Sequence, residues 1–128
     1  MKKTFLLITL FLGLALAASP ALAGQENPLP EKLPAPGMVT LIDLGAATCI
    51  PCKMMEPILS QLKKEYEGKA AVVFIDLRYH KEMAQEYKIR AIPTQILYDK
   101  NGNEVGRHEG FLSKEAIENA FKKLGVKK

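Results

Sequence analysis

From residue 38 onward, the sequence alternates between short apolar runs and longer segments with helical periodicity. The run from Val39 to Leu44 is apolar apart from Thr40 and Asp43, and Ala70 to Leu77 is a second such run. Continuous apolar runs of this length are typical of strands that are covered on both faces. Between them, residues 51–66 carry apolar side chains at helical spacing, namely Met54, Met55, Ile58, Leu59 and Leu62. The pattern therefore predicts a strand, a helix whose methionines face the core, and a second strand.

The second half of the chain continues this alternation. A short helix is expected over residues 81–87, a strand over 94–98, a turn at 99–102 and a strand over 104–108. Ser113 is a good N-cap for a last helix, which Gly125 would end. The core face of that helix would carry Ala116, Ile117, Ala120, Phe121 and Leu124. These elements predict an α/β fold in which helices flank a central mixed sheet of four to five strands.

The first 23 residues have the three regions of a secretory signal peptide. Two lysines precede an apolar stretch from Phe5 to Ala18, and the small-residue sequence Ala21-Leu22-Ala23 follows. We expect export and cleavage after Ala23. The apolar stretch is shorter than the roughly 20 residues that span a bilayer, which favours cleavage over the alternative of a permanent anchor.

Residues 24–37 contain four prolines and little apolar periodicity, so they are predicted to form an extended tether before a single domain at 38–128. The whole chain has 128 residues and a formal net charge of +4. Cleavage would remove Lys2 and Lys3 and lower the charge to +2, with 16 basic and 14 acidic residues remaining. This small and dispersed charge predicts no nucleic-acid partner.

The only two cysteines lie in the sequence Cys49-Ile50-Pro51-Cys52, between the first strand and the first helix. Two thiols at this spacing can form and reopen a small-ring disulfide. At a helix N-terminus, unpaired backbone N–H groups and the positive end of the helix dipole stabilise a thiolate on Cys49. Pro51 suits the first helical turn, which does not need its missing N–H group.

Other uses of the cysteine pair are weaker alternatives. A permanent disulfide with so short a loop would restrict the unfolded chain little. A zinc site would need His80 and His108, which are distant in sequence, and covalent haem attachment would need a histidine where Lys53 stands. Copper could use Met54, Met55 and His108 as ligands, although both methionines fit the core face of the helix.

The chain resembles the thioredoxin family over about residues 39–124. Asp43 lies six residues before Cys49, where thioredoxins place a buried aspartate, and residues 49–54 match the active-site pattern. Residues 56–59 match the family's kinked helix, and residues 89–94 match the loop that carries its cis-proline. The resemblance implies the thioredoxin fold and thiol–disulfide exchange.

The resemblance also assigns roles to individual residues. Cys49 is expected to be the nucleophile, and the more buried Cys52 would resolve the mixed disulfide from one helical turn away. Asp43 would have a raised pKa and take the proton from Cys52, directly or through a water. Pro93 is expected to be cis and to bring the Ile92 backbone beside Cys49 as an edge for an extended substrate.

The chain also departs from the family pattern. Thr48 replaces the tryptophan before the first cysteine, and Ile50-Pro51 replaces glycine-proline. The expected substrate rim therefore consists of Thr48, Ile50, Pro51, Ile92 and Pro93. Phe74 aligns where thioredoxins often carry a lysine partner for the aspartate, and the family's first strand and helix are shortened or missing.

The resulting hypothesis is a monomeric periplasmic thiol–disulfide oxidoreductase that mainly reduces disulfides of exported proteins. It would need no cofactor or metal other than its Cys49–Cys52 disulfide. The absence of a histidine between the cysteines and of a large helical insertion favours the reducing end of the potential scale. The resemblance implies a membrane thiol transporter of the DsbD or CcdA kind as electron donor. A thiol oxidase or isomerase and a non-enzymatic copper-binding module are the alternatives.

Overall fold

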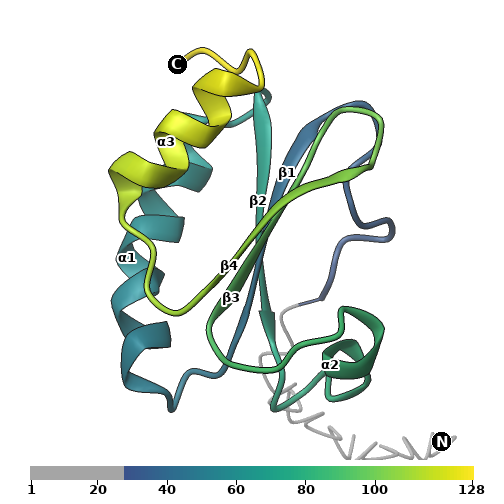
Figure 1. Cartoon of the computed structure of the whole chain (residues 1–128), viewed down its shortest axis with the longest axis vertical. Coiled ribbons are helices and arrows are strands. Elements are labelled where there is room, and N and C mark those ends of the chain that lie inside the picture. The colour runs from purple at the N-terminus through teal and green to yellow at the C-terminus, as the bar shows by residue number, and fades with distance from the viewer. Residues whose placement is uncertain (1–27) are drawn as a thin grey trace, which may run out of the picture.

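The computed structural model describes residues 28–128, which form one sheet with three helices (Figure 1). The strands are β1 (Val39–Gly45), β2 (Ala70–Asp76), β3 (Thr94–Tyr98) and β4 (Glu104–Glu109). Their order in the sheet is β2-β1-β3-β4. The predicted α/β architecture with a mixed sheet is confirmed, and the described residues form four strands.

The pairing of the strands follows from their connections. β1 and β2 are parallel because helix α1 (Ile50–Glu65) connects them, whereas β3 runs antiparallel to both β1 and β4. The turn between β3 and β4 uses Gly102 at a positive φ of 82°, and Asp99 Oδ1 accepts backbone hydrogen bonds from Asn101 and Asn103. The turn signal in the sequence therefore predicts this hairpin correctly.

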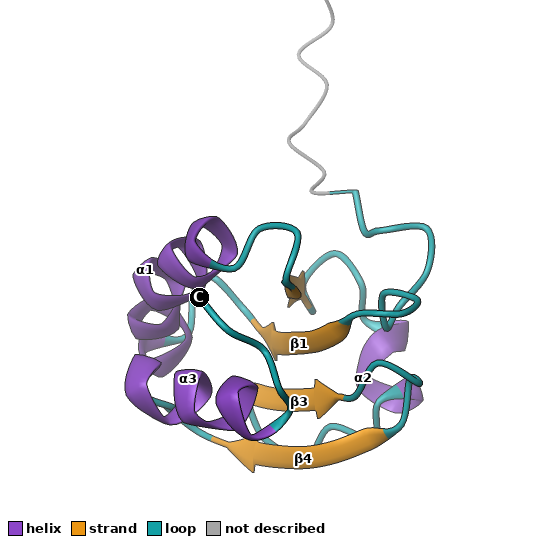
Figure 2. Ribbon diagram, turned by 90° about the horizontal axis from the view of Figure 1, so that it is seen from above, coloured by secondary structure: helices purple, strands orange, loops and turns teal. Residues whose placement is uncertain are grey.

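Helices cover both faces of the sheet (Figure 2). α1 and α3 (Lys114–Lys123) lie on one face, and the short α2 (Glu82–Glu86) lies on the other. Ser113 is the N-cap of α3, as predicted, and its hydroxyl accepts a hydrogen bond from the Ala116 N–H group at 3.2 Å. Cys49 is the N-cap of α1, so the first cysteine stands at the start of the helix.

The apolar core has two parts, one on each side of the sheet. The larger part joins α1 and α3 to the sheet, and its fully buried members include Met55, Leu62 and Phe121. The prediction that Met54 also faces the core is wrong, because its side chain is 53% exposed. Met54 lies in the first turns of α1 and projects to the surface, and Met55 alone of the two methionines is buried.

Residues 28–38 lie against the sheet before β1 begins. Leu29 and Leu33 pack on the smaller part of the core, together with Ile42, Ile75 and other residues. The Ala35 N–H group donates a hydrogen bond to the buried Thr40 Oγ1 at 3.0 Å. This part of the predicted tether therefore contributes to the packing of the domain.

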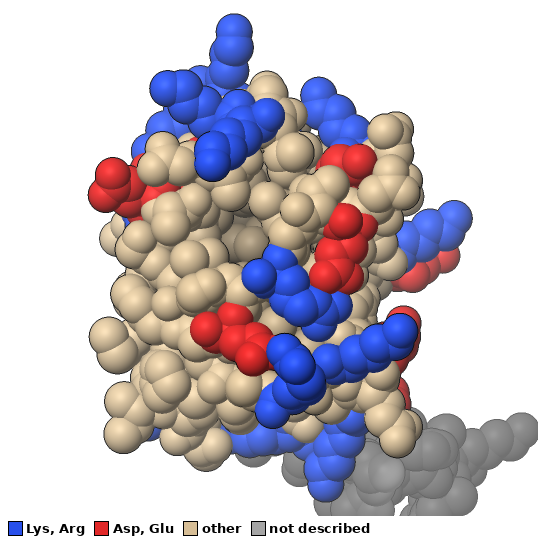
Figure 3. All heavy atoms as spheres, viewed as in Figure 1, with Lys and Arg blue, Asp and Glu red and all other residues tan. Residues whose placement is uncertain are grey.

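The predicted signal peptide and residues 24–27 lie outside the described residues. Among the helices from residue 28 onward, none combines the length and the apolar character that crossing a membrane requires. On the face shown in Figure 3, acidic and basic side chains are interspersed, and a group of basic side chains stands at the end of the molecule where the chain terminates.

Candidate functional site

The two cysteines form a disulfide at the N-terminus of α1, with their Cα atoms 5.2 Å apart. Cys49 has an extended backbone, and its sulfur accepts the Cys52 N–H group at 3.4 Å. The first turn of α1 contains Pro51 and no acidic residue. Unpaired N–H groups and the helix dipole therefore favour negative charge on Cys49 when the disulfide is open.

The two cysteines differ in their exposure to solvent. Cys49 is partly exposed, whereas only 4% of Cys52 is exposed. A partner disulfide can therefore reach the first cysteine but not the second. Nucleophilic attack by Cys49 followed by intramolecular attack by Cys52 is the order that this arrangement permits.

Gly45, the last residue of β1, has no side chain, and Cys52 packs closely against it. A Cβ atom on Gly45 would lie 3.0 Å from Cys52 Sγ and 3.4 Å from the Phe74 ring. Since alternate residues of a strand share a face, the side chain of Asp43 lies on the same side of the sheet as this contact. Asp43 therefore lies two residues before Gly45, on the face of the sheet that is covered by α1, the helix that carries Cys52.

Asp43 is fully buried, so its carboxyl does not face solvent. Burial raises the pKa of its carboxyl to about 6, against the lowering effect of a hydrogen bond from Gln95. Gln95 Nε2 donates to Asp43 Oδ1 at 2.7 Å. Within the described part of the chain, Asp43 Oδ2 and Gln95 Oε1 are buried without a hydrogen-bond partner.

Phe74 stands opposite Asp43 in the register of β1 and β2, as the sequence alignment predicted. An aromatic ring supplies neither a cation nor a hydrogen bond to the carboxyl. Asp43 consequently lacks the lysine that often accompanies this aspartate in thioredoxins. Among residues 28–128, its side-chain partner is Gln95, which comes from β3 on the opposite side.

The loop before β3 approaches the disulfide. The Ile92 carbonyl oxygen lies 4.0 Å from Cys49 Sγ, and the Ile92–Pro93 peptide bond is cis. The Gly110 N–H group donates to the Pro93 carbonyl at 2.8 Å, and the Thr94 hydroxyl donates to the Ala91 carbonyl at 2.6 Å. These bonds hold the loop against the end of β4.

The predicted substrate rim is partly apolar and exposed. Ile50 is 75% exposed and Ile92 is 39% exposed; Thr48 is also exposed, whereas Pro51 is half-buried and Pro93 is buried. Two further large apolar side chains are exposed: Met54, in the first turns of α1, and Phe111, which the sequence reasoning did not consider and which follows the Gly110 that is hydrogen-bonded to Pro93. The only sequence feature that could have pointed to Phe111 is its place directly after a loop glycine, Gly110.

Gln95 is the other residue that sequence reasoning missed. Its side chain is 2% exposed although it is polar, and it lies in strand β3 between Thr94 and Ile96. A buried amide must find a hydrogen-bond partner, so the signal was a glutamine between strand residues that point into the core. The partner could not be named without the register that places Gln95 opposite Asp43.

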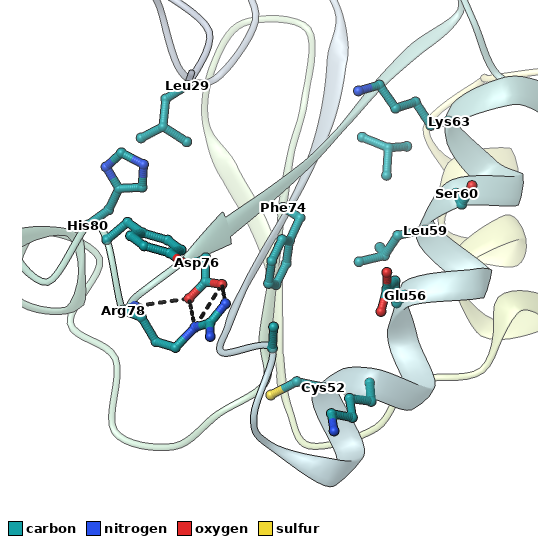
Figure 4. A pocket seen from close by; sticks show the side chains of 14 residues that line it. Leu29, Cys52, Glu56, Leu59, Ser60, Lys63, Phe74, Asp76, Arg78 and His80 are labelled. Carbon is teal, nitrogen blue, oxygen red and sulfur yellow. Dashed lines mark hydrogen bonds and ion pairs between the residues drawn. The ribbon is translucent and has the colours of Figure 1, made fainter. Parts of the chain in front are cut away.

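A cleft of about 900 Å³ lies beside Cys52, between α1 and the end of β2 (Figure 4). The Cys52 sulfur stands at one end of it, and Phe74 lies in its wall. Arg78 forms an ion pair with Asp76 at 2.6 Å in the same wall. This pairing lowers the pKa of the Asp76 carboxyl.

The two histidines that were considered as metal ligands lie apart in the chain. His80 lines the cleft after β2, whereas His108 lies in β4 with its Nε2 atom 3.1 Å from the Phe111 carbonyl oxygen. Across residues 28–128, no three His, Cys, Asp or Glu side chains are grouped so that they could hold a metal ion.

Comparison with known proteins agrees with this geometry. The thioredoxin family model matches residues 25–123. The chain belongs to the thioredoxin family. Thioredoxin from Staphylococcus aureus is 39% identical over 79 residues, which cover 62% of this chain and 75% of that protein. With its Cys49–Cys52 disulfide, this family member is a thiol–disulfide oxidoreductase.

Solved thioredoxin structures share the fold. Chloroplastic thioredoxin z superposes with a TM-score of 0.64 at 25% identity, covering 70% of this chain and 80% of that chain. The germline-specific thioredoxin Deadhead from Drosophila melanogaster gives a TM-score of 0.60 at 30% identity, with 69% and 82% covered.

Proposed function

We propose that this thioredoxin-like oxidoreductase works in the periplasm and mainly reduces disulfides of exported proteins. The observation that carries the reductase role is the partly exposed Cys49 at the N-cap of α1, with the buried Cys52 joined to it. The signal-peptide pattern of residues 1–23 supports export. The neutral Ile50-Pro51 pair between the cysteines supports a reducing potential.

The proposed reaction uses the cysteines in sequence. The Cys49 thiolate attacks a partner disulfide, forms a mixed disulfide and displaces one partner thiolate, which takes up a proton from solvent. The Cys52 thiol then gives its proton to Asp43, directly or through a water, and attacks Cys49 Sγ. This second step forms the Cys49–Cys52 disulfide and releases the second partner thiolate, so two electrons pass to the partner.

The surface around Cys49 supports a protein substrate. The exposed Ile50 and Ile92, together with Met54 and Phe111, offer apolar contacts, and the Ile92 backbone offers an edge for an extended segment. In an oxidising compartment the reduced state must be renewed. We therefore propose a membrane thiol transporter of the DsbD or CcdA kind as the electron donor, and no metal or further cofactor.

Two cysteine variants test the exchange. Cys49→Ser is expected to abolish reduction of insulin disulfides, and Cys52→Ser is expected to trap mixed disulfides with periplasmic proteins. The exposed Ser60→Ala change on the same helix is a matched control that should do neither. Retained insulin reduction in Cys49→Ser would refute the nucleophile assignment.

The reduction potential of the Cys49–Cys52 pair tests the direction of electron flow. A value of roughly −230 mV or lower against glutathione and dithiothreitol supports a reductase. A value near roughly −120 mV would make the protein a disulfide donor and would contradict the proposed direction. For the location, protein from the periplasmic fraction should begin at Gly24, and a product that keeps residues 1–23 would contradict cleavage.

A further inference from the structure

A row of four side chains crosses the sheet two residues before Gly45, the residue against which Cys52 packs. The strand register pairs residues of β2, β1, β3 and β4 in the order Phe74, Asp43, Gln95 and His108. Residues that stand opposite one another in a sheet share a face, so the four side chains lie on the side that α1 and α3 cover. The row joins the buried carboxyl in the centre of the sheet to the exposed edge strand.

Gln95 is the partner of the carboxyl in this row. Its Nε2 atom donates to Asp43 Oδ1 at 2.7 Å, and both side chains are almost completely buried. On the other side of Asp43, Phe74 offers no hydrogen bond. Oδ2 is left without a partner among residues 28–128, although it is buried. The hydrogen bond thus engages one carboxyl oxygen and leaves the other free.

We propose that Gln95 is a positioning residue for thiol–disulfide exchange: its amide fixes Asp43 by Oδ1, so that Oδ2 receives the proton that Cys52 releases. Cys52 packs against Gly45, which follows Asp43 by two residues in β1. The Cys52 sulfur therefore lies on the same face of the sheet as the Asp43 side chain. This inference rests on the proposed role of Asp43 as proton acceptor. Gln95 itself touches neither the sulfur atoms nor the substrate rim.

A neutral amide suits this task better than a cation would. A lysine or arginine beside a carboxylate strongly favours its charged form and lowers its pKa, whereas a neutral donor stabilises that form less. Burial therefore dominates, and the pKa of Asp43 stays raised, at about 6. A base whose pKa lies near the working pH transfers protons efficiently.

The other elements around Asp43 bring few charges to it. α1 packs its buried face, including Cys52 and Met55, over the sheet. His108 stands beyond Gln95 on β4. Besides Cys52, the titratable and charged groups that line the cleft with Phe74 are Lys53, Glu56, Lys63, Asp76, Arg78, Tyr79 and His80. None of these groups is among the causes that shift the pKa of Asp43, whereas the Gln95 hydrogen bond is, so Gln95 is the residue whose change should act on the carboxyl directly.

The test compares Gln95→Met with the unaltered protein. Methionine keeps the length of the side chain and removes the hydrogen bond. The carboxyl carbon of Asp43 is titrated by ¹³C NMR in the oxidised protein, and insulin reduction is measured across the same pH range. We expect both midpoints to rise by about one pH unit, because the charged carboxylate loses its donor. Leu97→Val, on the same face of β3, is the control and should leave both midpoints unchanged.

An Asp43 midpoint that Gln95→Met leaves in place would overturn the proposal, as would a shift in that midpoint without a shift in the insulin profile. If the unaltered protein reduced no insulin at all, the proposed reductase function would fail, while the carboxyl titration would still report on the contact with Gln95. The two failures are therefore distinguishable.

A second measurement needs no change at Gln95. In the unaltered protein, the side-chain amide protons of Gln95 should shift with the same midpoint as Asp43, and Asp43→Asn should abolish that shift. If the chemical shifts of these amide protons did not change as Asp43 titrates, the proposal would be overturned, even if Gln95→Met failed to fold.

Discussion

Two aspartates on neighbouring strands have opposite surroundings. Asp43 lies in the centre of the sheet, where its side-chain partner is the neutral amide of Gln95, and burial raises its pKa to about 6. Asp76 ends β2 at the edge of the sheet, where the Arg78 backbone N–H group and two guanidinium nitrogen atoms donate to the carboxyl and lower its pKa. Asp43 is completely buried, whereas 9% of Asp76 is exposed. Burial outweighs the hydrogen bond from Gln95 and lets Asp43 titrate, whereas at the less buried Asp76 the cation outweighs burial and keeps the carboxyl ionised.

The two carboxyls should therefore give stability opposite dependences on pH. The pKa of Asp43 is raised above its ordinary value of 3.8, so the folded state binds more protons than the unfolded state between about 3.8 and 6. The stability contributed by Asp43 is complete below this window and is lost as the pH rises through it. For Asp76, whose pKa is lowered, the contribution is present above the ordinary value of 3.8 and is lost as the pH falls through its folded pKa.

Asp43→Asn should give the largest effect on stability. It removes a buried charge that only a neutral group compensates, so the free energy of unfolding at pH 7 should rise by up to about 3 kcal/mol. The gain should disappear below about pH 4, where Asp43 is protonated. Urea denaturation at both pH values measures it. A loss of stability at pH 7 would show that the carboxylate is well compensated, and the contrast with Asp76 would fail.

Gly45→Ala tests whether Cys52 lies directly over the strand that carries Asp43. The added methyl group would stand 3.0 Å from a sulfur that the disulfide holds in place, and we expect a loss of about 2 kcal/mol. Gly106→Ala is the matched control, since its Cβ atom would meet only Leu97 at an ordinary 4.0 Å. Equal effects of the two changes in urea denaturation would argue against the close packing of Cys52 on Gly45.

Asp76→Asn should destabilise the protein, the opposite sign to Asp43→Asn. It weakens a charge-assisted contact to Arg78, which is partly exposed, so the expected loss at pH 7 is about 1 kcal/mol. A double-mutant cycle with Arg78→Gln assigns the loss to the pair. A coupling energy of zero would mean that the ion pair does not account for the behaviour of Asp76.

Arg90→Gln should have the smallest effect. Arg90 pairs with Glu109 at 3.0 Å, but its side chain is 82% exposed, so solvent and salt screen the interaction. We expect a loss below roughly 0.5 kcal/mol that vanishes in 1 M salt. A larger loss that persists in 1 M salt would show that solvent exposure does not determine how much an ion pair contributes to stability.

The sequence predicted the fold well because its signals were local. The apolar runs of β1 and β2, the turn at residues 99–102 and the Ser113 cap each depend on neighbouring residues, and the structure has each of them. Met54 was assigned wrongly because helical spacing defines a stripe, whereas burial depends on how far the sheet extends beneath the first turns of α1.

The candidate site was predictable only in part, for the same reason. Cys49, Cys52 and Asp43 follow from a motif and its spacing, and Phe74 from an alignment without gaps. The contact between Gln95 and Asp43 joins residues 52 positions apart, and it depends on the register of β1 and β3. No local pattern specifies that register, so a buried glutamine could be noticed but not given a partner.

The most direct measurement is a ¹³C NMR titration of both aspartate carboxyl groups in one sample of the oxidised protein. Asp43 should titrate at about 6, and Asp76 below its ordinary value of 3.8. Two aspartates that titrate together near 3.8 would contradict the contrast between them, and with it the proposal that Asp43 is the proton acceptor for Cys52.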